Sequence, residues 1–128
     1  MKLQSVLAAL AFTLAHSAFA GGEHKHARQH QPLHGGVVVE VKDIAYELVA
    51  KPTAIQLYLR DHGKPADVSK ASAKLTLLSG TDKQEVELQP AGDKLEATGS
   101  FKVGPGTKAV AVITKGGKVA GTGRFVLK

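Results

Sequence analysis

Short segments in which apolar and polar residues alternate follow one another from residue 37 to the end of the chain. The clearest is residues 55–60, where Ile55, Leu57 and Leu59 share one face of an extended chain and the intervening residues, up to Arg60, share the other. A period of two residues is typical of a strand that is buried on one face. The same reasoning predicts strands over residues 37–41, 46–50, 55–60, 71–77, 85–88, 95–103, 109–114 and 119–127.

Turn-forming residues separate these segments at intervals of about 8 to 12 residues. Residues 61–65 and the glycine pair at 116–117 are examples, and no segment shows a convincing helical period. Seven to eight short strands with such turns favour an all-β fold, an antiparallel β-sandwich of immunoglobulin-like size. The Cys and Trp residues that mark antibody domains are absent, so a barrel or an unrelated sandwich remains an alternative.

Residues 1–20 have the pattern of a cleavable signal peptide. Lys2 precedes an apolar stretch over residues 3–14, and a small-x-small cleavage motif ends at Ala20. The apolar stretch is shorter than the roughly 20 residues of a membrane span, and no later segment approaches that length. The pattern predicts an exported protein that is cleaved after Ala20 and has no stable membrane insertion.

The rest of the chain divides into two parts. Residues 21–33 are polar and lack apolar periodicity, which predicts a flexible, disordered arm, and residues 34–128 form one β domain. The chain has no Cys, and its only Met is Met1. These absences exclude thiolate chemistry and leave nitrogen and oxygen as the ligands of any metal site. The formal net charge is +6, but no dense basic run occurs, which argues against a nucleic-acid partner.

Four of the six histidines lie close together, at His24, His26, His30 and His34. Neutral imidazole is a common ligand for transition metals, and His-rich tracts are typical of metal binding. We therefore predict that these four residues bind a divalent transition metal, Cu(II) or Zn(II), without an organic cofactor. The alternative is a spacer that only aids solubility. If trimming also removed Gly21, His24 would be third in an amino-terminal copper or nickel site.

The spacing of these histidines favours a flexible site. His30 and His34 are four residues apart, as in helical zinc sites, but Pro32 between them disfavours a helix. An arm that wraps an ion loses conformational entropy, so we expect moderate affinity and weak selectivity. His34 adjoins two glycines and the first strand, where it could be a fixed ligand or simply pack. His62 lies in a turn and is expected to be solvated.

No motif of a known enzyme class is present. The chain lacks a Gly-x-Ser-x-Gly elbow, a glycine-rich phosphate loop and a His-Glu-x-x-His zinc motif, so we predict that the protein is not an enzyme. Glu85 and Glu87 share one face of a predicted strand and are expected to face water. Tyr46 and Glu47 begin an otherwise apolar strand and are harder to set aside, although a tyrosine there is most often at the edge of the core.

Three stretches resemble a small periplasmic β-domain: His-Gly-Gly-Val-Val at 34–38, Tyr-Glu-Leu-Val at 46–49, and Leu-Tyr-Leu-Arg-Asp-His-Gly-Lys-Pro at 57–65. That domain is found in periplasmic adaptor subunits of heavy-metal efflux systems of the resistance-nodulation-division class, and in stand-alone exported metal-resistance proteins. The chain lacks the coiled-coil hairpin, lipoyl-like half-motifs and barrel region of a whole adaptor. The resemblance implies a metal-related function in the periplasm. It also implies that His34 corresponds to the histidine of that domain's His-Gly-Gly motif.

Two functional hypotheses follow. The first is a periplasmic metal-binding or metal-delivery protein that works with a heavy-metal efflux adaptor or transporter. The second is an envelope interaction module that docks a partner by strand addition and has no physiological metal.

Overall fold

A computed structural model describes residues 31–128, which form nine β-strands. The strands are β1 (Val37–Val41), β2 (Ile44–Ala50), β3 (Ala54–Asp61), β4 (Lys64–Pro65), β5 (Ala71–Ser79), β6 (Asp82–Ala91), β7 (Lys94–Thr98), β8 (Lys108–Lys115) and β9 (Lys118–Val126). Within this range no helix of the length and hydropathy of a membrane span is found. The predicted signal peptide and residues 21–30 of the predicted arm lie outside the described residues.

Burial follows the alternation seen in the sequence. In β3, Ile55 and Leu57 are fully buried, whereas Gln56 between them is partly exposed. An antiparallel strand with one face on the core has this period. The inward-facing side chains of the strands meet in one core. Its largest fully buried members include Leu48, Ile55, Leu57, Leu75, Leu77, Leu88, Leu95 and Ile113.

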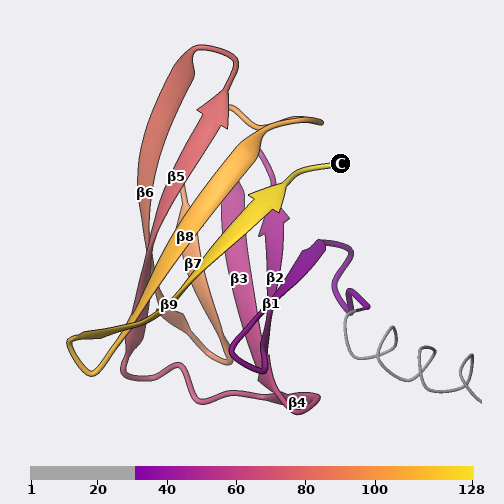
Figure 1. The fold of residues 1–128 in the computed structure, drawn as a ribbon. Coiled ribbons are helices and arrows are strands. Elements are labelled where there is room, and N and C mark those ends of the chain that lie inside the picture. Colours follow the sequence, from indigo (N-terminus) through magenta and orange to yellow (C-terminus); the bar gives the residue numbers. More distant parts are fainter. Residues whose placement is uncertain (1–30) are drawn as a thin grey trace, which may run out of the picture.

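The strands form one antiparallel sheet that nearly closes into a barrel (Figure 1). Their order is β1-β2-β3-β7-β6-β5-β8-β9, and β4 pairs with β3. Strand β6 joins the two halves, because residues 82–88 pair with β5 and residues 89–91 pair with β7. The edge strands β1 and β9 consequently lie side by side. The predicted all-β, antiparallel class is confirmed, whereas the immunoglobulin-like sandwich is not confirmed.

Two glycines of β9 allow the edge strands to approach. A Cβ atom on Gly121 would lie 2.5 Å from Oη of Tyr46, and one on Gly123 would lie 3.3 Å from Cγ2 of Val39. Because no side chains project there, the Tyr46 ring packs beneath β9 and belongs to the core. Burial raises the pKa of the Tyr46 phenol above its ordinary value of 10.0.

The turn between β1 and β2 sets the register of these two strands. Lys42 and Asp43 both have positive φ angles, 51° and 68°. Two such residues make a tight hairpin turn whose twist matches that of the strands. This register places Val38 beside Glu47, and the pairing of β2 with β3 places Tyr58 on its other side. Because Tyr46 and Leu48 belong to the core, Glu47 between them lies on the face of β2 that points away from it.

One predicted strand is shorter than expected. The strand predicted for residues 95–103 ends at Thr98. Beyond this point the backbone leaves the sheet, and the N–H group of Phe101 donates to the carbonyl oxygen of Pro52 at 2.8 Å. The prediction is therefore wrong for residues 99–103, because a bond to a distant turn replaces the sheet pairing there.

Candidate functional site

Residues 31–36, which we call the strap, lie on the outward face of β2 and β3 just before the chain enters β1. Three backbone N–H groups of the strap donate to the carboxylate of Glu47. The donors are Leu33 at 3.0 Å, His34 at 2.7 Å and Gly36 at 2.9 Å. The strap is thus attached to β2 mainly through its own main chain.

Glu47 is fully buried beneath the strap. Backbone N–H groups that converge on one carboxylate form an anion-binding nest. Burial alone would raise the pKa of Glu47, but the N–H groups of Gly36, Leu33 and His34, together with the His34 ring, hold it below its ordinary value of 4.5. The carboxylate is therefore ionised at neutral pH, and it can only accept hydrogen bonds.

The two glycines after His34 allow the strap to follow this path. Gly35 has a φ of +79°, in the left-handed region that favours glycine. A Cβ atom on Gly36 would overlap the backbone carbonyl of Leu48 on β2. The two glycines thus allow the main chain of the strap to lie directly against β2. This close contact places His34 beside Glu47.

The ring of His34 is held on two sides. Its Nδ1 atom lies 3.1 Å from Oε1 of Glu47. Its face stacks on the ring of Tyr58, with the centroids 3.6 Å apart and the planes 4° from parallel. The side chain nevertheless remains 39% exposed. Because the Glu47 carboxylate only accepts hydrogen bonds, Nδ1 of the His34 ring is placed to donate to it.

Arg60 completes the buried polar cluster. Its side chain is only 8% exposed, and its Nη2 atom lies 3.8 Å from Oε1 of Glu47. The same Nη2 atom donates to the carbonyl oxygen of Gln31 at 3.0 Å, whereas Nε has no hydrogen-bond partner in the described part of the chain. Alternation correctly places Arg60 on the outward face of β3. On this face its side chain contacts the strap through the bond to Gln31.

The three stretches on which the family resemblance rests meet at this cluster. His34 belongs to the first, Glu47 to the second, and Tyr58 and Arg60 to the third. Sequence reasoning identified His34 but assigned no role to the other three residues. Two features of the sequence could have indicated that Glu47 has a special role. It is a charged residue at the centre of an apolar strand, and a glycine pair lies upstream of it.

The other predicted ligands, His24, His26 and His30, lie outside the described residues. His62 is 81% exposed, as expected, and its Nδ1 atom is 2.5 Å from Oδ1 of the neighbouring Asp61. From residue 31 onward, no three His, Cys, Asp or Glu side chains are grouped in a way that could hold a metal ion.

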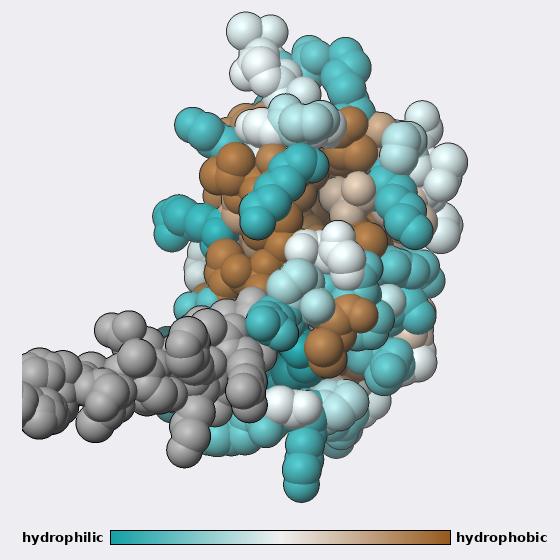
Figure 2. All heavy atoms as spheres, turned by 90° about the vertical axis from the view of Figure 1, so that its right-hand side faces the viewer, coloured by the Kyte–Doolittle hydropathy of each residue, from teal (hydrophilic) through white to brown (hydrophobic). Residues whose placement is uncertain are grey.

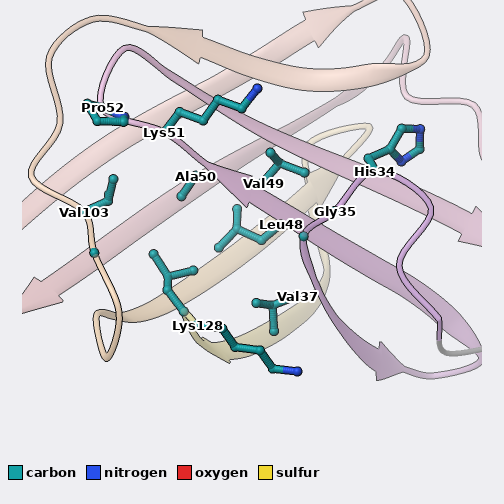
Figure 3. Close-up of a pocket in the computed structure, with 13 residues that line it drawn as sticks. His34, Gly35, Val37, Leu48, Val49, Ala50, Lys51, Pro52, Val103 and Lys128 are labelled. Atoms are coloured by element: carbon teal, nitrogen blue, oxygen red, sulfur yellow. The ribbon is translucent and has the colours of Figure 1, made fainter.

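Two hollows adjoin the strap. The larger, of about 340 Å³, lies between the start of β1, the end of β2 and the chain after β9. Lys51 and Lys128 stand on opposite sides of its apolar side chains (Figure 3). This side of the molecule carries apolar surface bordered by hydrophilic residues (Figure 2). His34 lines this cleft and also a smaller hollow of about 160 Å³ over β3.

Comparisons with known proteins identify no family for this chain. No protein-family model and no curated protein matches the chain. A solved structure of a carbohydrate-binding module, described as the Br derivative of BhCBM56, aligns with 73% of this chain and 96% of its own, at 8% identity and a TM-score of 0.39. A likeness this distant carries no argument about function.

Proposed function

We propose that this protein binds a divalent transition metal, Cu(II) or Zn(II), in the periplasm and passes it to, or holds it for, a heavy-metal efflux adaptor or transporter. One observation carries the proposal. The His34 ring is fixed by Glu47 and Tyr58 while part of it remains exposed. A ligating histidine commonly has its second ring nitrogen bonded to a carboxylate in this way.

The other ligands are His24, His26 and His30, which precede the strap in sequence. His30 is bonded directly to Gln31, whose carbonyl oxygen is anchored by Arg60. Four residues span at most about 14 Å in an extended chain, so His30 and His34 can bind one ion together. His34 supplies the fixed ligand, and the preceding segment supplies the others.

Calorimetric titration of the exported chain with Zn²⁺ and Cu²⁺ tests this assignment. Replacement of His34 by Ala should weaken binding by about tenfold or more, since loss of even an outer partner of a ligand costs that much. Replacement of all four histidines should abolish the site. His62→Ala is the matched control and should bind as the natural protein does. Equal stoichiometry and affinity in the natural and four-alanine proteins would overturn the proposal.

A second candidate function, an interaction module for an envelope partner, is favoured by the apolar cleft beside the edge strands β1 and β9. Strands β1 and β9 lie side by side without being paired with each other, and a strand edge without such a partner can pair with an extended segment of another protein. If this function is correct, a partner captured by the chain should be retained in the presence of a chelator and after deletion of residues 21–33. A partner released by the chelator would instead support metal-dependent delivery.

A further inference from the structure

The contacts of Glu47 bear on which atom of His34 can bind a metal. An imidazole has two nitrogens, and in its neutral form either one can carry the proton. Here Nδ1 of His34 lies 3.1 Å from Oε1 of Glu47, and the backbone N–H of His34 donates to the other carboxylate oxygen at 2.7 Å. His34 is thus bound to Glu47 at two points, one on the ring and one on the backbone.

Rotation of the ring is opposed by the same contacts. A half-turn about the Cβ–Cγ bond would exchange Nδ1 for a carbon atom and leave Oε1 of the buried carboxylate without this donor. The loss of a hydrogen-bond donor is unfavourable for a buried acceptor, because water cannot replace the donor there. A smaller tilt would separate the ring from Tyr58, which is stacked within 4° of parallel. The orientation of the ring is therefore determined before any ion arrives.

We propose that Glu47 is a positioning residue that holds the proton on Nδ1 of His34 and thereby selects Nε2 as the metal-binding atom. This inference rests on the proposed function, because it describes how the same site is prepared. Tyr58 stacks on a face of the imidazole, so this contact does not involve the ring edge that carries Nε2. A carboxylate partner also makes the imidazole a stronger donor to the metal.

Nitrogen NMR of the metal-free chain provides a direct test. Long-range ¹H–¹⁵N spectra, recorded at a pH where the imidazoles are neutral, identify the protonated nitrogen of each ring. His34 should be in the Nδ1–H form. Glu47→Gln, which keeps the shape of the side chain but removes its charge, should raise the fraction of the Nε2–H form. Glu87→Gln removes an exposed carboxylate from β6 and is the matched control, in which His34 should be unchanged.

Addition of Zn²⁺ to the same samples separates the two proposals. In the natural protein the Nε2 signal of His34 should shift on binding while Nδ1 keeps its proton, and Glu47→Gln should bind Zn²⁺ about 10- to 100-fold more weakly. An Nε2–H ring in the metal-free natural protein, or ligation through Nδ1, would overturn the role of Glu47. If His34 has the Nδ1–H form but no histidine signal responds to Zn²⁺ or Cu²⁺, the metal function is overturned, and with it the ligand selection.

These measurements do not depend on the stability of the variant. If Glu47→Gln fails to fold, the protonated nitrogen and the ligating nitrogen of the natural protein still decide the assignment. Tyr58→Phe gives a second check, since it keeps the stacked ring and the carboxylate. His34 should remain in the Nδ1–H form in that variant, and a change of tautomer there would show that Tyr58 rather than Glu47 holds the proton in place.

Discussion

Glu47 and Glu87 occupy equivalent positions on opposite halves of the sheet, and their surroundings are opposite. Each lies on the outward face of a strand whose neighbouring residues point into the core. Glu87 is exposed and is paired in register with Lys74, whereas Glu47 is fully buried and lies across from Tyr58. The difference comes from the strap, which covers β2 and β3. The environment of an outward-facing residue is thus decided by chain segments that are not part of the sheet.

The largest contrast should appear when each carboxylate is removed. Glu47→Ala leaves three backbone N–H groups without their acceptor and Arg60 without its counter-charge. Removal of one partner of a buried ion pair typically costs about 3 to 5 kcal/mol. Glu87→Ala, on a solvated face, should change the free energy of unfolding by no more than about 0.5 kcal/mol. Urea unfolding of both variants measures the difference, and similar losses would mean that the strap does not bury Glu47 in solution.

A second contrast uses two glycines. In Gly36→Ala the new Cβ overlaps the carbonyl of Leu48, so the strap must shift away from β2. Forcing an extra methyl group into a packed site costs about 1 to 3 kcal/mol. A Cβ atom on Gly104 would meet nothing within 4 Å, and this glycine has no positive φ, so Gly104→Ala should be neutral or slightly stabilising. Thermal unfolding of both variants tests this. Equal melting temperatures would show that close approach at Gly36 is unnecessary.

The free energy of unfolding should depend on pH through the Glu47 carboxylate, and the direction of this dependence can be stated. The pKa of Glu47 is lower in the folded chain than its ordinary value of 4.5, so its ionised form stabilises the fold. This contribution is fully present above about pH 4.5 and is lost as the pH falls through the lowered folded-state value. The free energy of unfolding should therefore fall more steeply with acid in the natural protein than in Glu47→Gln. Parallel pH profiles for the two proteins would contradict this expectation.

The smallest contrast is between two histidines. His34→Ala removes a stacked pair and a hydrogen bond to Glu47, and aromatic stacking contributes about 0.5 to 1.5 kcal/mol. His62→Ala removes a ring that is exposed and, among the described residues, is bonded to its neighbour Asp61, so its effect should be below about 0.5 kcal/mol. Both are measured by chemical denaturation of the metal-free protein. A larger effect for His62 would contradict the assignment of His34 to the buried cluster.

Local patterns predicted the strands well because a strand's burial is set largely by its own alternation. Ile55 and Leu57 face the core, and Glu85 and Glu87 face water, as the sequence indicated. The hairpin turns also fell at residues suited to them. These features depend on neighbours in the chain, which a single sequence contains.

The polar cluster could not be derived in the same way, because its contacts join residues far apart in sequence. Glu47 is bonded to residues 11 to 14 positions earlier, and Arg60 reaches back 29 positions to Gln31. Alternation alone gave Arg60 the outward face of β3 but not its burial. The early end of β7 has a similar cause, since Phe101 bonds to a turn about fifty residues away in the chain.

The attachment of the strap also determines which of its positions are free to change over evolutionary time. Glu47 binds main-chain N–H groups, which every residue except proline provides. The Leu33 side chain is 64% exposed although its backbone is engaged, so many side chains would serve equally well there. Gly36 and Glu47 have no such latitude. In homologues of this chain, Gly36, Glu47 and the His34 that they hold should therefore be conserved, whereas position 33 should vary.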